Sequence, residues 1–187
     1  MMELIEGAGV FIYPLAICSL VAVFIVIERL YGLLSHRVCP PALVEKISRG
    51  QEVDPDEGSA LGRVVRFSRK NSADKGAAKA VARVEINRLE RGLVLLEMVI
   101  GAAPLLGLLG TVTGLIQVFA NISPETGLPE PQAFVEGVAL ALTTTVIGLS
   151  IAIPSLVANG YLQRRVETFA VRIESLIDLM YGTDDEA

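Results

Sequence analysis

Long uncharged apolar blocks separated by charged stretches give this chain a pattern that predicts three membrane-spanning helices. No Asp, Glu, Lys, Arg or His occurs in residues 7–27, 98–124 and 137–163, which are 21, 27 and 27 residues long. A helix of about 20 apolar residues is long enough to cross the hydrocarbon core of a bilayer. We therefore predict an all-α membrane protein with three transmembrane helices.

Helical periodicity continues beyond the second and third apolar blocks. Residues 77–97 are rich in Ala, Lys, Arg and Glu and enter the second block without a helix breaker, with Ser72 as the expected N-cap. Their mixed charges are typical of a solvated helix face. After the third block, six apolar residues recur at spacings of three and four, as on an amphipathic helix: Val166, Phe169, Ile173, Leu176, Ile177 and Met180. Both helices are expected to extend into the cytoplasm and to pack on each other or on neighbouring subunits, because neither segment can bury a core alone.

These patterns divide the chain into six segments. We predict an N-terminus with the first transmembrane helix (1–34), a helical loop (35–92) and the second transmembrane helix (93–122). A short turn (123–131), the third transmembrane helix (132–163) and an amphipathic tail (164–187) follow. Within the loop, Pro40 and Pro41 can open a short helix over 42–49, and 51–59 reads as a surface loop. The turn has three prolines and one glycine, which favours a tight extended connection.

The distribution of charge predicts the orientation of the chain. All 16 Lys and Arg residues fall in two stretches, thirteen between residues 29 and 91 and three between 164 and 172. The only charged side chains in the first nine residues and in the turn are acidic. Because basic residues mark cytoplasmic segments, the N-terminus is expected outside and the C-terminus in the cytoplasm. The two cysteines, Cys18 and Cys39, are interpreted as structural or incidental thiols rather than as a disulfide.

Small residues form a stripe along each of the last two apolar blocks. At helical spacing, each set shares one face, which lets helices approach closely. These predicted packing residues are Ala103, Gly107, Gly110 and Gly114 in the second block, and Gly137, Ala141 and Gly148 in the third. Pro104 and Pro154 lie within the same blocks and are expected to kink the helices, because proline removes a backbone donor.

Three consecutive threonines, Thr143, Thr144 and Thr145, form the only hydroxyl cluster inside an apolar block. Each hydroxyl could simply bond a carbonyl three or four residues earlier, which is common in membrane helices. A functional interpretation gains weight from Thr111, which lies at a similar depth in an antiparallel hairpin. No ionisable side chain lies within the spans, so the chain alone cannot relay protons. It is therefore either a scaffold or works with a partner that supplies the titrating group.

Other chemistry is weakly indicated. His36 reads as a solvated loop residue, because no Cys or acidic residue surrounds it at metal-ligand spacing. Glu136 reads as an acidic residue placed near a helix N-terminus. We find no phosphate-binding loop, metal cluster, nucleophile elbow or catalytic dyad in the sequence. We therefore expect no enzyme activity, no cofactor, no metal site and no nucleic-acid partner.

Residues 103–114 (APLLGLLGTVTG) and 137–154 (GVALALTTTVIGLSIAIP) together resemble the MotA/TolQ/ExbB proton-channel family. The layout of three spans with an external N-terminus resembles its ExbB/TolQ branch. The resemblance implies a five-fold ring in the bacterial inner membrane, around an ExbD/TolR-like single-span partner whose aspartate titrates. It also implies a possible TonB/TolA-like effector. Thr111 and Thr145 match the family threonines that face the aspartate, and Thr144 is an adjacent candidate for the ion pathway. Leu140 occupies a position where the family usually has glutamate.

The leading hypothesis is a ring subunit of a motor driven by the proton motive force, which would energise envelope transport or maintenance. The alternative is a structural membrane oligomer that conducts no ions. A small-molecule transporter is disfavoured, because the sequence shows no pair of broken helices and no buried charge. The resemblance to the ExbB/TolQ branch makes the proton the expected ion rather than sodium.

Overall fold

The computed structural model describes residues 9–51, 58–70, 74–123 and 127–182, and these residues are almost entirely helical. The elements in chain order are η1 (Gly9–Phe11), α2 (Ile12–Gly32), α3 (Ser35–Val38), α4 (Pro41–Ser48), α5 (Ala60–Lys70), α6 (Lys75–Ala120) and α7 (Pro131–Gly182). Three helical segments, Gly9–Gly32, α6 and α7, are long and apolar enough to cross a membrane. The prediction of an all-α protein with three transmembrane helices is therefore confirmed, and the protein is a multi-pass membrane protein.

The chain divides into two compact units. One comprises Met1–Val26 and Leu95–Asn159, and we call it the membrane unit because it contains most of the apolar blocks. The other comprises Ile27–Val94 and Gly160–Ala187, and we call it the charged unit because it contains every Lys and Arg of the chain. Helices α2, α6 and α7 each contribute residues to both units, so their polar extensions belong to continuous helices.

α6 and α7 are 46 and 52 residues long, and neither is interrupted at its internal proline. Pro104 and Pro154 lie inside these helices, and the kinks expected at them stay predictions. α6 begins at Lys75 beside Asp74, whose Oδ1 accepts a hydrogen bond of 2.7 Å from the Ala77 amide, as an N-cap does. The predicted cap, Ser72, lies outside the described residues.

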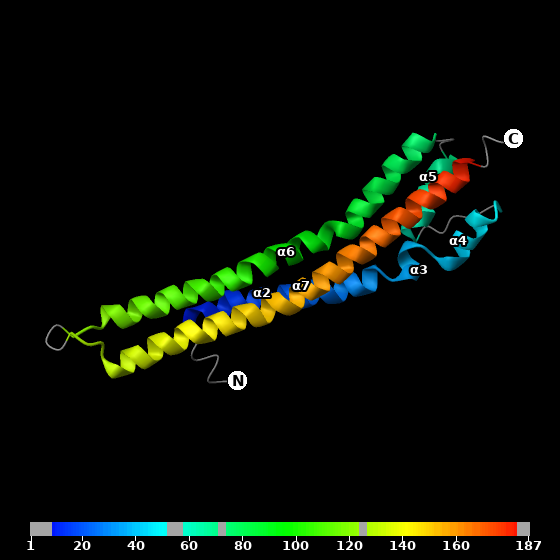
Figure 1. The fold of residues 1–187 in the computed structure, drawn as a ribbon. Coiled ribbons are helices and arrows are strands. Elements are labelled where there is room, and N and C mark those ends of the chain that lie inside the picture. Colours follow the sequence, from blue (N-terminus) through cyan, green and yellow to red (C-terminus); the bar gives the residue numbers. More distant parts are fainter. Residues whose placement is uncertain (1–8, 52–57, 71–73, 124–126, 183–187) are drawn as a thin grey trace. The chain divides into compact units, whose positions relative to one another are not determined.

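A tight connection joins α6 to α7. The amide of Ser123 donates to the carbonyl of Leu128 at 2.9 Å, and the amide of Glu130 donates to the carbonyl of Asn121 at 3.0 Å. Gly127 has a φ of +66°, a conformation that glycine adopts without steric cost. In Figure 1, this connection turns the chain back so that the membrane parts of α6 and α7 run antiparallel. They form a helical hairpin.

The charged unit is held by apolar side chains from its short helices and from the tail of α7. Five of the six tail residues predicted to form an apolar face are buried, which confirms that face: Val166, Phe169, Ile173, Leu176 and Ile177. α4 lies where a short helix was expected. α5 was not predicted, yet Leu61, Val64 and Val65 on it are at most 1% exposed. These segments pack on one another within a single chain.

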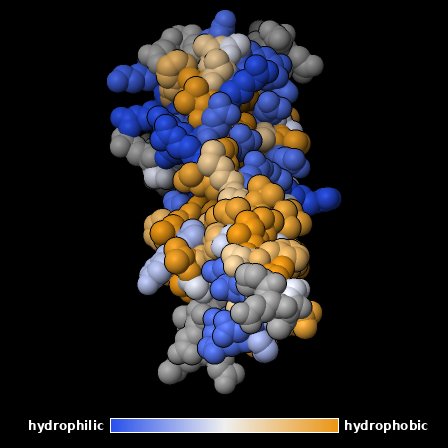
Figure 2. Space-filling model, turned by 90° about the vertical axis from the view of Figure 1, so that its left-hand side faces the viewer, coloured by the Kyte–Doolittle hydropathy of each residue, from blue (hydrophilic) through white to orange (hydrophobic). Residues whose placement is uncertain are grey.

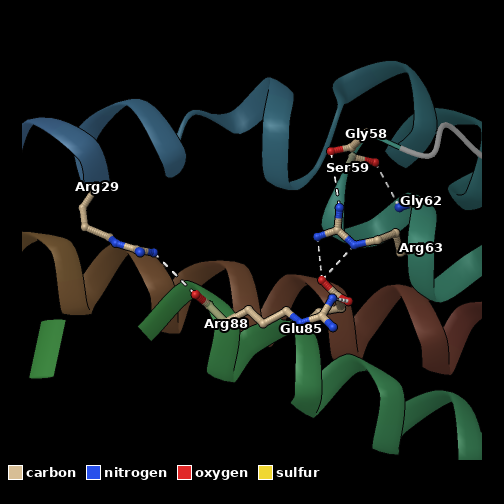
Figure 3. Close-up of polar contacts among 7 residues, drawn as sticks. All are labelled: Arg29, Gly58, Ser59, Gly62, Arg63, Glu85 and Arg88. Carbon is tan, nitrogen blue, oxygen red and sulfur yellow. Dashed lines mark hydrogen bonds and ion pairs between the residues drawn. The ribbon is translucent and has the colours of Figure 1, made fainter. Parts of the chain in front are cut away.

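One carboxylate of the charged unit is buried between two arginines (Figure 3). The side chain of Glu85 on α6 is only 5% exposed, and its Oε2 accepts a hydrogen bond of 2.9 Å from Nε of Arg63 on α5. Its Oε1 accepts a bond of 2.7 Å from Arg88, one turn further along α6. The expectation that all charges of this segment lie on a solvated face was therefore wrong for Glu85, because α5 covers it.

A glycine makes room for a charged side chain where α2 meets α6 in the charged unit. Nη1 of Arg29 donates to the carbonyls of Arg88 and Leu89 at 3.4 and 3.2 Å (Figure 3 shows the first of these bonds). A Cβ atom on Gly92 would lie 3.1 Å from Cζ of Arg29 and closer still to its Nε. The guanidinium therefore occupies space that any other residue at position 92 would fill.

Two further groups of the charged unit have shifted acid–base behaviour. Cys39 is 1% exposed, and burial raises the pKa of its thiol to about 11, although the nearby Arg172 acts in the opposite direction. Hydrogen bonds from Lys79 and Lys75, at 2.8 and 3.1 Å, lower the pKa of the Asp178 carboxyl. The tail of α7 is thus tied to the start of α6 by an exposed ion pair.

Candidate functional site

The predicted small residues lie where α6 and α7 contact each other within the hairpin. A Cβ on Gly107 would lie 2.8 Å from the Thr144 carbonyl oxygen, and one on Gly137 would lie 2.5 Å from the Gly114 carbonyl oxygen. Real Cβ atoms do not approach other atoms so closely, so the two backbones are in direct contact. This contact lies between two helices of the same chain.

The contact extends along the hairpin from Ala103 and Gly148 to Gly114 and Gly137. Nearer its base, a Cβ on Gly148 would lie 2.5 Å from the carbonyl oxygen of Ala103, which is fully buried. Nearer the turn, a Cβ on Gly114 would lie 3.3 Å from that of Ala141. All seven predicted packing residues therefore lie in the contact between α6 and α7, and a role for them between subunits stays a prediction.

Thr144 lies inside this contact. Its side chain has no exposed surface, and it occupies the space beside Gly110, where a Cβ atom would lie 2.5 Å from the Cβ of Thr144. The Thr144 hydroxyl is 2.8 Å from the Leu140 carbonyl, 3.2 Å from that of Ala141 and 3.2 Å from that of Gly107. Thr144 therefore has acceptors on both helices, and its place in an ion pathway stays a prediction.

Thr145 and Thr111 each bond one of two successive carbonyls of α6. The Thr145 hydroxyl lies 3.4 Å from the Gly107 carbonyl, and the Thr111 hydroxyl donates to the next carbonyl, that of Leu108, at 2.7 Å. Both side chains are only partly buried within the chain. The two residues predicted from the family resemblance thus lie at the same depth, as the hairpin argument required.

Both threonines lie on the same side of the hairpin. Successive helix residues are rotated by about 100°, so Thr145 follows Thr144 away from the contact line, and Thr111 follows Gly110 in the same sense. Because the helices are antiparallel, equal rotations lead to the same side. Leu140 lies on the other side of that line, where its Cδ1 is 3.6 Å from a Cβ built on Gly9 of η1. The first helical segment therefore begins on the side away from Thr111 and Thr145.

The remaining positions that the sequence singled out in the membrane unit lie away from Thr111 and Thr145. Leu140, at the position where the family usually has glutamate, is 9% exposed. Glu136 is exposed near the start of α7 and accepts a hydrogen bond of 3.0 Å from Gln132. The hydroxyl of Thr113 bonds the Leu109 carbonyl at 2.9 Å. No hydrogen bond of the Thr143 hydroxyl is found within the described part of the chain.

The outer faces of the hairpin are apolar, as a membrane environment requires. Figure 2 shows hydrophobic side chains gathered in a band on the face in view. More than half of the surface of several large apolar side chains is exposed: Leu105, Leu108, Ile116, Phe119, Leu142 and Ile153. Against this surface, Thr111 and Thr145 offer hydroxyls that can both donate and accept, which suits contact with a carboxyl group in either protonation state. Within the described residues, no group of three His, Cys, Asp or Glu could hold a metal ion.

Comparison with known proteins identifies the family. The family model described as "MotA/TolQ/ExbB proton channel family" matches residues 59–175, which is more than half of the chain. The chain belongs to this family. Its match within the MotA/TolQ/ExbB family includes α5, both helices of the hairpin and most of the α7 tail. The resemblance inferred from residues 103–114 and 137–154 is therefore confirmed.

Individual relatives point to the ExbB branch of the family. The chain is 33% identical to the putative biopolymer transport protein ExbB-like 1 of Synechocystis, over 96% of this chain and 78% of that protein. It is 28% identical to the biopolymer transport protein exbB1 of Vibrio cholerae, over 94% of this chain and 85% of that protein. A putative ExbB homologue of Methanothermobacter thermautotrophicus is 26% identical over 92% of this chain and 66% of that protein.

Proposed function

We propose that this chain is the ring subunit of an ExbB/TolQ-like motor that uses the proton motive force. In this proposal, five copies in the bacterial inner membrane surround an ExbD/TolR-like single-span partner that carries the titrating aspartate. The N-terminus lies in the periplasm and the C-terminus in the cytoplasm. The motor energises envelope transport or maintenance through a TonB/TolA-like effector, and the chain itself is not an enzyme.

One observation carries this proposal. Thr111 and Thr145 lie at one depth on the side of the hairpin away from Gly9, and the apolar blocks of α6 and α7 contain no acidic or basic side chain. Two hydroxyls at one depth suit a membrane site that stabilises a carboxyl group supplied by another chain. The names of the relatives support biopolymer transport as the process.

In the proposed cycle, a proton reaches the partner's aspartate along the face that carries Thr111 and Thr145. The carboxylate accepts hydrogen bonds from these hydroxyls, and the protonated carboxyl can donate to them. Its change of charge lets the partner's helix move within the ring. A potential of 100 mV provides about 2.3 kcal/mol for each elementary charge that crosses the membrane, so repeated transfers are needed to do substantial work.

The test is to co-express the chain with the single-span, Asp-bearing protein encoded beside its gene, and to measure oligomer mass and proton flux in liposomes. We expect five copies of this chain with the partner, and a flux that depends on that Asp. Thr145→Val and Thr111→Val should each lower the flux about tenfold with the ring intact, because each removes a hydrogen bond to a charged group. Thr113→Val is the matched control, because at about 100° per residue Thr113 lies on the other side of the line of Gly110 and Gly114 from Thr111, and its hydroxyl bonds the Leu109 carbonyl.

A monomer, or a ring that binds no partner and conducts no protons, would overturn the proposal. The ring without partner or flux would favour the structural membrane oligomer, which the bonding of Thr111 and Thr144 within the chain also supports. Full flux in both valine variants would remove the roles of Thr111 and Thr145 without changing the family.

A further inference from the structure

The carbonyl of Gly107 is shared by more donors than a carbonyl can fully satisfy. In a continuous α-helix it accepts the amide of Thr111, four residues later. The hydroxyls of Thr144 and Thr145 also lie within reach of it, at 3.2 and 3.4 Å. A carbonyl oxygen has two lone pairs, and the Thr111 amide uses one of them. The two hydroxyls therefore compete for the lone pair that remains.

The two hydroxyls differ in their alternatives. Thr144 has a closer acceptor on its own helix, the Leu140 carbonyl at 2.8 Å, and a further one at Ala141. Thr145 bonds no other carbonyl within the described residues, and 3.4 Å is well beyond the usual length of about 2.8 Å for a hydroxyl bond. The Thr145 hydroxyl is therefore held weakly and can turn toward another acceptor on the side of the hairpin away from Gly9.

Thr144 also sets the separation of the helices at this depth. Its Cγ2 would lie 2.7 Å from a Cβ built on Gly110, so its methyl group occupies the space that this glycine leaves. The same approach brings Cα of Thr145 within 3.1 Å of a Cβ built on Gly107. A change at Thr144 therefore alters both the distance from Thr145 to α6 and the competition for the Gly107 carbonyl.

We propose that Thr144 is a positioning residue that keeps the hydroxyl of Thr145 weakly bonded and ready to turn toward a carboxyl group of the partner's membrane helix. The role toward the partner's carboxyl group rests on the proposed function, whereas the competition for the Gly107 carbonyl does not. Thr144 itself does not touch the carboxyl group, because its side chain is fully buried within the chain.

A double-mutant cycle of the chain alone in nanodiscs tests the shared carbonyl. Thr145→Val in the wild-type background should lower the thermal midpoint only slightly, because the bond it removes is weak. In the Thr144→Val background, the Thr145 hydroxyl no longer competes, so its removal should cost about 2–4 °C. Thr143→Val, in place of Thr144→Val, is the matched control and should show no coupling. Additive effects of the Thr144 and Thr145 changes would overturn the proposal.

Proton flux with the co-expressed partner then tests the consequence. Thr144→Val should lower the flux several-fold and shift its pH dependence, because the Thr145 hydroxyl is then held by Gly107. Thr144→Ser keeps the hydroxyl and should restore the wild-type pH dependence, at a lower thermal midpoint. Unchanged flux and pH dependence in Thr144→Val would contradict the positioning role. Absence of flux in the wild-type complex would instead contradict the proposed function. The thermal double-mutant cycle would still show whether the two hydroxyls compete for the Gly107 carbonyl.

Discussion

The membrane unit and the charged unit are both helical, but different contacts hold them together. In the membrane unit, Gly107, Gly114 and Gly137 allow two backbones to touch, and large apolar side chains point outward. In the charged unit, large apolar side chains point inward and ion pairs bridge the helices. Glu85, almost fully buried between Arg63 and Arg88, has no counterpart among the described residues of the membrane unit.

The difference reflects the solvent that surrounds each unit. Burial of apolar side chains gives no advantage over lipid, so membrane helices associate through close packing and small residues. In water, the hydrophobic effect favours an apolar core, and charged side chains can remain at its edge. A glycine therefore stabilises helix contact in one unit, whereas leucine and valine do so in the other.

The largest expected effect comes from filling the glycine contact. Gly110→Val would place a branched side chain where Thr144 lies, and the hairpin would have to separate. Overpacking of this kind should lower the free energy of unfolding by about 3 kcal/mol. Thermal unfolding in detergent measures it, with Gly101→Ala as the control, because nothing lies within 4 Å of a Cβ at Gly101. Equal stability of the two variants would show that the close contact contributes little.

In the charged unit, the corresponding test removes the buried charge. Glu85→Gln keeps the shape of the side chain but leaves Arg63 and Arg88 without their carboxylate, and should cost about 2 kcal/mol of unfolding free energy. Glu45→Gln disrupts the exposed pair with Arg49 and should cost less than about 0.5 kcal/mol. Chemical denaturation of the two variants compares the effects. Similar losses would mean that burial does not strengthen the Glu85 pairs.

A smaller effect is expected at alkaline pH. The pKa of the Cys39 thiol is raised from 9.0 to about 11 in the folded chain, so the folded state holds this proton more tightly than the unfolded state does. The resulting stability is complete below pH 9 and is lost as the pH rises through 11, with about 1 kcal/mol gone by pH 10. Cys39→Ala should remove this part of the pH dependence. Identical alkaline profiles of variant and wild type would contradict it.

The smallest effect is expected in acid. The pKa of Asp178 lies below its ordinary value of 3.8 because Lys79 and Lys75 bond the carboxylate. The stability that this bonded carboxylate gives to the folded state is present above that ordinary value and is lost as the pH falls through the lowered pKa. The group is exposed, so the thermal midpoint should change only slightly. Asp178→Asn should show no such change between pH 5 and pH 2, values chosen to bracket the ordinary range.

Most of the fold could be predicted from the length of the uncharged apolar blocks and from the helical spacing of apolar residues. Blocks free of charge are rare outside membranes, and the apolar spacing of Val166, Phe169 and Ile173 has one simple structural solution. α5 was not predicted, because its 11 residues include four basic side chains and no acidic residue or long apolar run. The burial of Glu85 could not be predicted either, since it depends on this helix covering α6.

The candidate site was predictable as a set of residues but not as an arrangement. Spacing alone placed Gly107, Gly110 and Gly114 on one face, but it could not say that their partner was α7 of the same chain. Equal distance from the turn predicted that Thr111 and Thr145 share a depth. Helical spacing also puts Thr144 on the face of α7 that carries Gly137, Ala141 and Gly148, so its place inside the contact follows once that face packs on α6. The competition of the Thr144 and Thr145 hydroxyls for the Gly107 carbonyl depends on interatomic distances that the sequence does not give.

The contact between Arg29 and Gly92 has a consequence for the evolution of the chain. Any larger residue at position 92 would displace the guanidinium, and a shorter residue at position 29 would leave the glycine facing empty space. Neither substitution is tolerated easily without the other. Among relatives that keep this contact, the two positions should covary, with arginine at one accompanied by glycine at the other.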